Sequence, residues 1–253
     1  MRKFVLAMSI LLISVALFAQ RKKPDVVVDL KFTPQEGVQV DSLALPLSLL
    51  ERSVDIRWKD ARNQADAFAI GSGTDDDDRS SPIRASTDVL EWVGSSVGVI
   101  AGSQGLETKS PADRRLDISL SRFTVRESNK ALGSTYSAEI HLAYTLNDAK
   151  GRKLTEGAAS GTANRYGKSR SGPNMSEVLS DALKDAFNGV LADPNVQASW
   201  ISGKPSSGAA SKSTAAPAET TEEKLKKLDD LLKKGVISKE EHKAARAKIL
   251  EDL

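Results

Sequence analysis

The stretch Tyr136-Ser-Ala-Glu-Ile-His-Leu-Ala-Tyr-Thr-Leu146 decides the fold of this chain. Every second residue in it is apolar or aromatic, and each residue between them is small or polar. Successive side chains of a strand point to opposite faces of a sheet, so this alternation predicts a strand with one buried and one solvated face. A sheet built around this strand is therefore expected at the centre of the protein.

The sequence on both sides of this strand supplies its neighbours. Residues 116–125 also alternate, but the phase changes near Ser121 or Arg122, which predicts a strand with a β-bulge. Residues 147–151 predict a hairpin turn, and residues 154–166 predict its return strand. Short connections of this kind favour antiparallel pairing.

Two shorter strands and two helices complete the expected domain. Alternating runs at 26–32 and 54–58 predict the strands. Apolar residues at helical spacing predict one helix that follows an N-cap at Thr87 and a second that follows an N-cap at Asn174. We therefore expect an α+β domain over residues 25–200, in which a mostly antiparallel sheet carries two helices on one face.

The chain begins with the features of a secretory signal peptide, residues 1–19. Arg2 and Lys3 precede an almost unbroken apolar run at 4–18, and Ala19 is a small residue suited to the position before a cleavage site. The run is shorter than the ~20 residues that a transmembrane helix needs, although an uncleaved N-terminal anchor is the alternative. We therefore expect a protein that is exported to the periplasm or cell envelope.

The composition excludes several classes of protein. The chain has no cysteine, which excludes disulfides, thiol nucleophiles and the acylated cysteine of a bacterial lipoprotein, so we expect no lipid anchor. Its 36 basic and 34 acidic residues give a formal net charge of +2, and loss of Arg2 and Lys3 with the signal would leave 34 of each. A near-neutral protein has no global field that recruits nucleic acid, so we expect no nucleic-acid partner.

The C-terminal part of the chain changes character twice. Residues 201–221 are mainly small or polar and cannot bury enough apolar surface to offset the entropy of ordering, so we expect a flexible linker. Residues 222–253 carry apolar residues at helical spacing on either side of Gly235, with Ser238 as an N-cap, which predicts an αα-hairpin. Two such short helices are marginal alone in water, so we expect the hairpin to bind a protein partner or another copy of the chain. The residues expected to make this contact are Leu225, Leu228, Leu232, Val236, Ile237, His242, Ala245 and Ile249.

Two segments resemble known families. The run Leu231-Leu-Lys-Lys-Gly-Val-Ile-Ser238 and the residues after it resemble the SHOCT domain, except that His242 stands where that module usually has Phe or Tyr. This resemblance implies a small interaction or oligomerisation module. The body, with Leu30-Lys-Phe-Thr-Pro34 and Val54-Asp-Ile-Arg-Trp-Lys-Asp60 among its motifs, is similar to the YajG-like envelope lipoproteins. That resemblance implies an envelope protein from a family without an assigned reaction.

No set of residues in the sequence points to catalysis. A hydrolase needs a base for its nucleophile near neutral pH, and the two histidines lie in different modules, His141 on a polar strand face and His242 in the hairpin. The four aspartates at 75–78, within a predicted loop over 71–82, lack the alternate spacing of a calcium-binding loop and are interpreted as solvated. We expect no enzymatic activity, no metal and no cofactor.

The sequence thus predicts a non-enzymatic envelope protein that acts as a binding or assembly module, with the hairpin as its interaction or oligomerisation element. The alternative is a periplasmic small-ligand carrier with a pocket between the helices and the sheet face of Tyr136, Ile140 and Tyr144. Asp60 and Arg62 follow the 54–58 strand directly, and they either face a ligand or form a local ion pair.

Overall fold

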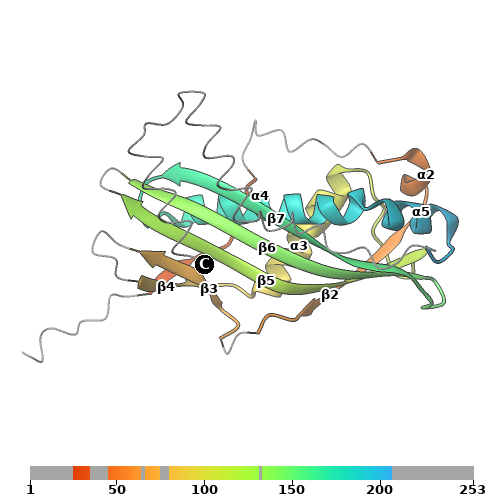
Figure 1. Cartoon of the computed structure of the whole chain (residues 1–253), viewed down its shortest axis with the longest axis horizontal. Helices are drawn as coiled ribbons and strands as arrows, with labels where there is room; N and C mark the ends of the chain where they lie inside the picture. Colours follow the sequence, from red (N-terminus) through yellow and green to blue (C-terminus); the bar gives the residue numbers. More distant parts are fainter. Residues whose placement is uncertain (1–24, 35–44, 64–65, 75–79, 131–132, 207–253) are drawn as a thin grey trace, which may run out of the picture.

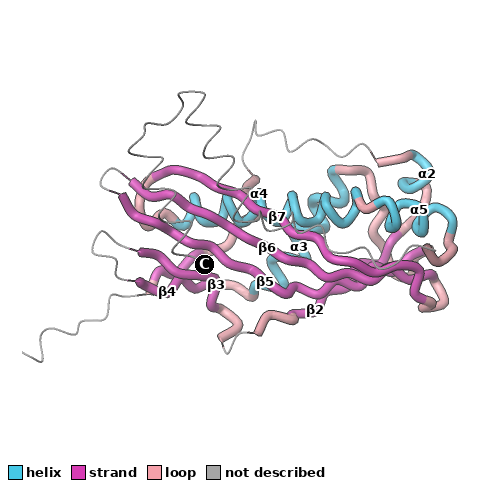
Figure 2. Tube along the Cα trace, viewed as in Figure 1, coloured by secondary structure: helices cyan, strands magenta, loops and turns pink. Residues whose placement is uncertain are grey.

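The computed structural model describes residues 25–34, 45–63, 66–74, 80–130 and 133–206. The expected signal peptide, the aspartates at 75–78 and the C-terminal hairpin lie outside these ranges, as does most of the expected linker. The predictions for those segments therefore stay predictions. Figures 1 and 2 show the described part as long strands with helices that run behind them.

A mixed, mostly antiparallel sheet of seven strands organises the described residues. The strands are β1 (Val26–Val28), β2 (Val54–Asp60), β3 (Ala69–Thr74), β4 (Ser80–Ala85), β5 (Arg114–Lys130), β6 (Gly133–Asp148) and β7 (Lys153–Gly167). Their order is β1-β4-β3-β5-β6-β7, and β2 also pairs with β5 (Figure 1). The antiparallel pairs hold most of the paired residues, because β5, β6 and β7 are much longer than the other strands.

Strand β5 has two partners along one edge. Its first part, from Arg114 to Leu120, pairs in parallel with β2, and a later part, from Val125 to Ser128, pairs in parallel with β3. The register between β5 and β6 shifts between Leu120 and Arg122, which confirms the predicted β-bulge. The predicted hairpin turn between β6 and β7 is also confirmed, with the N–H of Gly151 bonded to the carbonyl of Asp148 at 2.9 Å.

Four helices lie in the described residues: α2 (Leu47–Leu50), α3 (Val89–Ser103), α4 (Gly172–Ala192) and α5 (Pro194–Ser202). The sequence predicted only α3 and α4, because α2 is a single turn and α5 follows the end of α4 at Asp193 without a break. Asp193 both ends α4 and caps α5, and Pro194 opens the second of these helices. The caps of the other two helices were also predicted wrongly by a few residues: Asp88 caps α3 in place of Thr87, and Ser171 caps α4 in place of Asn174.

The core lies between the sheet and α4, which packs against β7 and β6, while α3 contacts α4 and β2 (Figures 1 and 2). Leu183, Ala186 and Phe187 on α4 are fully buried. The closest approach is at Gly161 of β7, where a Cβ atom would lie 2.0 Å from the carbonyl oxygen of Ala182. Glycine at this position therefore lets helix and strand meet backbone to backbone.

The structure corrects two predicted boundaries near the N-terminus. The predicted loop over 71–82 is wrong at both ends, because β3 continues to Thr74 and β4 begins at Ser80, while residues 75–79 lie outside the described residues. Glycines suggested a loop there, but a Cβ atom on Gly71 would lie 1.7 Å from the carbonyl oxygen of Val125, so this glycine serves the close pairing of β3 with β5. The run at 26–32 forms a strand only over β1.

The described body continues beyond residue 200, where the linker was expected to begin. Helix α5 ends at Ser202, with Gly203 in the left-handed conformation after it. Further on, the N–H of Ser206 donates to the carbonyl of Leu154 on β7 at 3.0 Å. Residues 201–206 are thus attached to the edge of the sheet at β7.

Tyr144 on β6 connects the sheet to the junction of α4 and α5. Its side chain is buried, and its hydroxyl donates to the carboxylate of Asp193. The same carboxylate caps α5, because it accepts from the N–H of Asn195 with a nitrogen-to-oxygen distance of 2.7 Å. The ring passes over Gly157, where a Cβ atom would lie 2.4 Å from the hydroxyl oxygen. Burial, and then the neighbouring Asp193 carboxylate, raises the pKa of Tyr144 above its ordinary value of 10.0.

Replacing Tyr144 by phenylalanine should flatten the loss of stability at high pH. The raised pKa keeps Tyr144 protonated in the folded state, so its contribution is full below about pH 10 and falls as the pH rises above the unfolded pKa. At neutral pH the free energy of unfolding of the variant should be about 1.5–3 kcal/mol lower, because the lost hydroxyl donates to a charged acceptor. Urea unfolding from pH 8 to 11 measures both effects. An unchanged slope against pH in Tyr144→Phe would contradict the assignment.

Candidate functional site

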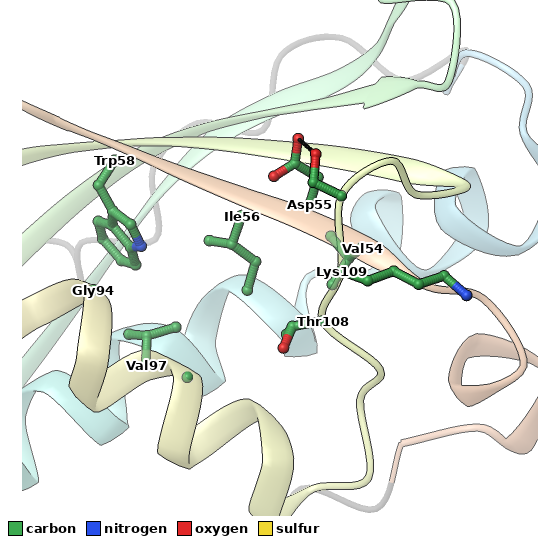
Figure 3. A pocket seen from close by; sticks show the side chains of 10 residues that line it. Val54, Asp55, Ile56, Trp58, Gly94, Val97, Thr108 and Lys109 are labelled. Carbon is green, nitrogen blue, oxygen red and sulfur yellow. Dashed lines mark hydrogen bonds between the residues drawn. The ribbon is translucent and has the colours of Figure 1, made fainter.

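An open groove of about 430 Å³ lies between β2 and α3. Figure 3 shows Ile56 and Trp58 pointing from the strand toward the helix, where Gly94 and Val97 face them, whereas Asp55 points to the other side of the strand. The loop at residues 108–110 closes one end. The walls that β2 and α3 contribute are therefore mainly apolar, and the polar lining residues belong to the loop at one end and to the rim.

The backbone of β2 presents a free edge beside this groove. The N–H and C=O groups of Val54 bond to the carbonyl of Glu107 and the N–H of Lys109, at 2.9 and 3.1 Å, on the side away from β5. The N–H of Ala61 instead bonds to Leu120 of β5 at 2.9 Å. Because these directions alternate along a strand, the groups of residues 56, 58 and 60 also point away from β5. Within the described ranges no strand pairs with them.

Two glycines of α3 keep the groove open. A Cβ atom on Gly94 would touch the indole of Trp58 at 3.5 Å, whereas one on Gly98 would meet nothing within 4 Å. Residues four apart lie on the same face of a helix, so the pair exposes a bare strip of backbone to the groove. The spacing of Gly94 and Gly98 is a signal in the sequence from which the groove could have been found, although glycines at this spacing equally suit close packing of a helix on a sheet. The free strand edge could not be read from the sequence, because it depends on which strands pair.

The charges around β2 are mostly paired locally. The guanidinium of Arg57 holds the carboxylate of Asp55 at 2.8 Å, and Ser110 also donates to that carboxylate. Lys109 pairs with Glu107 at 3.0 Å. Lys59 is exposed and has no carboxylate partner among the described residues. The outward face of this edge strand therefore carries a surplus of positive charge.

The buried carboxylate of Glu127 on β5 is a second polar centre, near the opposite end of the sheet. It accepts hydrogen bonds from the hydroxyls of Ser134 and Tyr136 at 2.8 and 3.0 Å and from the N–H of Arg170 at 2.5 Å. Arg170 has a φ of 54°, in the left-handed region. The carboxylate thus holds the loop between β7 and α4 against the sheet, which is a structural role.

The residues singled out in the sequence fall into separate places. Asp60 and Arg62 form the local ion pair, with the Nη2 to Oδ2 distance at 2.7 Å, and hydrogen bonds from Arg62 hold the pKa of Asp60 below its ordinary value. His141 lies on the outer face of β6, 2.7 Å from Glu139, as expected for a half-exposed sheet residue. His242 and the other residues of the hairpin, like the aspartates at 75–78, lie outside the described residues.

The pocket expected for a ligand carrier is not open at the predicted place. Tyr136, Ile140 and Tyr144 are 0%, 0% and 3% exposed, and α4 covers this face of β6. The groove beside β2 lies elsewhere and shares none of these residues. Within the described part of the chain, no group of three or more His, Cys, Asp or Glu side chains could hold a metal ion.

The fold places the chain among α+β domains built on one mixed sheet. A family model described as uncharacterized lipoprotein matches residues 49–199, more than half of the chain. The chain therefore belongs to this family of uncharacterised lipoproteins, and the expected relationship of its body to the envelope lipoproteins is supported. The family description states no reaction. The expected SHOCT domain lies outside the matched residues and stays a prediction.

Several solved structures are similar to the chain at low identity. A protein from Xanthomonas campestris is 13% identical with a TM-score of 0.46, over 72% of this chain and 99% of that one. A minor lipoprotein from Acinetobacter baumannii is 10% identical with a TM-score of 0.33, over 58% and 92% of the two chains. A lipoprotein from Neisseria meningitidis is 11% identical with a TM-score of 0.26, over 44% and 83%. No curated protein matches the chain.

Family membership contradicts the prediction that the chain has no lipid anchor, because lipoproteins are lipid-anchored proteins. That prediction, and the description of the protein as non-lipidated, rested on the absence of cysteine and is withdrawn. The absence of cysteine bears only on attachment through an acylated cysteine, whereas the family match rests on residues 49–199. Membership of a lipoprotein family makes the chain an exported envelope protein. None of the described helices has the length and hydropathy to cross a membrane.

Proposed function

We propose that this chain is a non-enzymatic binding protein of the cell envelope, and that the groove between β2 and α3 receives an extended segment of another protein. The observation that carries the proposal is the free backbone edge of β2 beside the groove, at residues 56, 58 and 60. An extended peptide can add a strand to such an edge, with its main chain supplying hydrogen bonds and its side chains filling adjacent pockets.

A small apolar ligand is the second candidate, because a volume of about 430 Å³ lies within the range of small-molecule sites. Such a ligand would fill the space between Trp58 and α3 but would leave the strand edge to water. A peptide uses both features of the site. We therefore place the peptide first.

The C-terminal segment 222–253 would supply a second contact. Its apolar stripes, which include Leu228 and Ile249, indicate that it packs against a partner or another copy. A tether of residues 207–221 would let the hairpin and the groove act on the same assembly. In this proposal the chain connects envelope components and does not transform a substrate.

Filling the groove should abolish capture of its partners. Gly98→Phe adds a ring to an exposed position that lines the groove, where a Cβ atom meets nothing within 4 Å, so the fold should be unaffected. Gly102→Phe is the matched control, because its Cβ also meets nothing and the residue is not among those that line the groove. The measurement is quantitative pull-down from an envelope fraction, with a form lacking residues 222–253 as the third sample.

Proteins that bind the unaltered chain, the Gly102→Phe variant and the tail-less form, but not the Gly98→Phe variant, are those that use the groove. Proteins lost only with the tail bind the hairpin. If Gly98→Phe retains every protein that Gly102→Phe retains, the groove has no partner and the proposal fails.

A further inference from the structure

We infer that the segment bound beside β2 alternates apolar and acidic side chains, with the apolar side chains in the groove and the acidic ones on the outer face of the sheet. This inference rests on the proposed function and names the chemistry of the partner. An added strand continues the pleat of its neighbour, so its side chains lie beside those of β2 on the same face of the sheet. The chemistry of each face of β2 therefore determines which side chains the segment needs on that face.

The groove side of the segment must be apolar. Ile56 and Trp58 point toward α3, where Gly94 and Val97 face them (Figure 3). Gly98 also lines the groove. The wall between Ile56 and Val97 is aliphatic, so a polar side chain buried against it would lose its hydration without gaining a hydrogen bond from either residue. Apolar side chains would instead cover the half-buried indole of Trp58.

The outer side of the segment must be acidic. Arg57 and Lys59 alternate with Ile56 and Trp58, and both are exposed on the face away from the groove. The side chain of Lys59 has no carboxylate partner among the described residues, and the Arg57 side chain is 58% exposed although it holds Asp55. Opposite charges directly across two strands stabilise their pairing, whereas like charges oppose it.

The segment must also be short. The loop at 107–109 occupies the edge at Val54, so the free edge covers residues 56–60. A segment of about five residues fills it, at ~3.3 Å per residue.

A second copy of β2 fits this edge poorly. A two-fold antiparallel alignment that sets Asp55 against Lys59 brings Asp60 of the second copy opposite Val54, where the 107–109 loop already lies. The alignment shifted by one residue on each copy sets Arg57 against Lys59, which are like charges. A peptide from a different protein meets neither obstacle.

The test uses two synthetic peptides and the full-length protein. The first is acetyl-Ser-Val-Glu-Leu-Glu-Val-Ser-amide, and the second carries Lys in place of each Glu. Binding is followed by tryptophan fluorescence, which reports Trp58 because Trp92 and Trp200 are 6% and 0% exposed. Amide hydrogen exchange of β2 gives the second readout, because residues 57 and 59 already face β5 while residues 56, 58 and 60 are free.

The expected result is binding of the acidic peptide, with exchange slowed at least about tenfold at Ile56, Trp58 and Asp60 and unchanged at Arg57 and Lys59. Lys59→Glu should weaken binding of the acidic peptide by about three- to tenfold and should strengthen binding of the basic peptide. Gly98→Phe should abolish binding of the acidic peptide, and Gly102→Phe should leave it intact.

Equal binding of the two peptides would overturn the acidic inference. Absence of peptide binding would overturn it too, and the proposed function would then stand if Gly98→Phe still removes partners in the pull-down and fall if it does not. Protection of the amides at 56, 58 and 60 that grows with protein concentration in the absence of peptide would identify a second copy as the occupant and refute the inference.

Discussion

Gly161→Ala should destabilise the protein by about 3 kcal/mol or more, a large part of the 5–15 kcal/mol that a typical domain has. The added Cβ would lie 2.0 Å from the carbonyl oxygen of Ala182 and 2.3 Å from the backbone nitrogen of Ala186. Both atoms belong to the backbone of α4, so no side-chain rotation relieves the contact. The helix must move away from β7, and the core that includes Leu183 and Phe187 must loosen with it.

Urea unfolding followed by circular dichroism measures the change. Gly102→Ala is the control, because this α3 glycine is exposed, its Cβ would meet nothing within 4 Å, and alanine should stabilise the helix by about 0.5–1 kcal/mol. The two substitutions are chemically identical and have opposite expected signs. A loss below about 1 kcal/mol in Gly161→Ala would mean that α4 does not approach β7 as closely as described.

Glu127→Leu should lower the free energy of unfolding by about 2–3 kcal/mol, because a buried cluster of three donors loses the carboxylate that they share. The hydroxyls of Ser134 and Tyr136 are in side chains with no exposed surface, and both lie within hydrogen-bond distance of this carboxylate and of one further acceptor or more. The N–H of Arg170 loses its bond as well, in a loop that the carboxylate holds in the left-handed conformation. The leucine is close in size to the glutamate, so the loss reports hydrogen bonding more than packing.

Two further variants isolate this effect in the same unfolding experiment. Glu127→Gln keeps one acceptor oxygen and should lose less than the leucine variant. Glu139→Leu removes a half-exposed carboxylate that pairs with Arg122 at 2.9 Å, and it should cost no more than about 1 kcal/mol. Equal losses in Glu127→Leu and Glu139→Leu would refute the view that burial makes the first carboxylate structurally decisive.

The long strands were predictable from the sequence because their environment is two-sided. From residue 136 to 146 the alternation of Tyr, Ile and Leu with Ser, Glu and His indicates which face of the strand is buried, independently of which strands pair with it. The bulge after Leu120 was predictable for the same reason, since a change of phase needs an extra residue. The short elements were not predictable, because α2 and α5 owe their existence to packing and to the cap at Asp193.

The candidate site shows the limit of such reasoning. The alternation of Ile56 and Trp58 predicted a strand, and the fold confirms it as β2. Nothing in that pattern says that β2 joins β5 in parallel, or that its other edge stays open beyond Val54. Strand order depends on contacts between residues far apart in the chain, which a local pattern does not encode.

The sequence by itself determined the α+β class, the long antiparallel strands, the bulge and the expectation of export, because each follows from local periodicity and composition. The tertiary structure alone decided the parallel placement of β2 and β3 on one edge of β5, the backbone contact at Gly161, the buried acceptor at Glu127 and the groove beside Trp58. The physical reason is that burial and edge pairing are properties of the assembled layers. A residue acquires them only when distant segments fold against it.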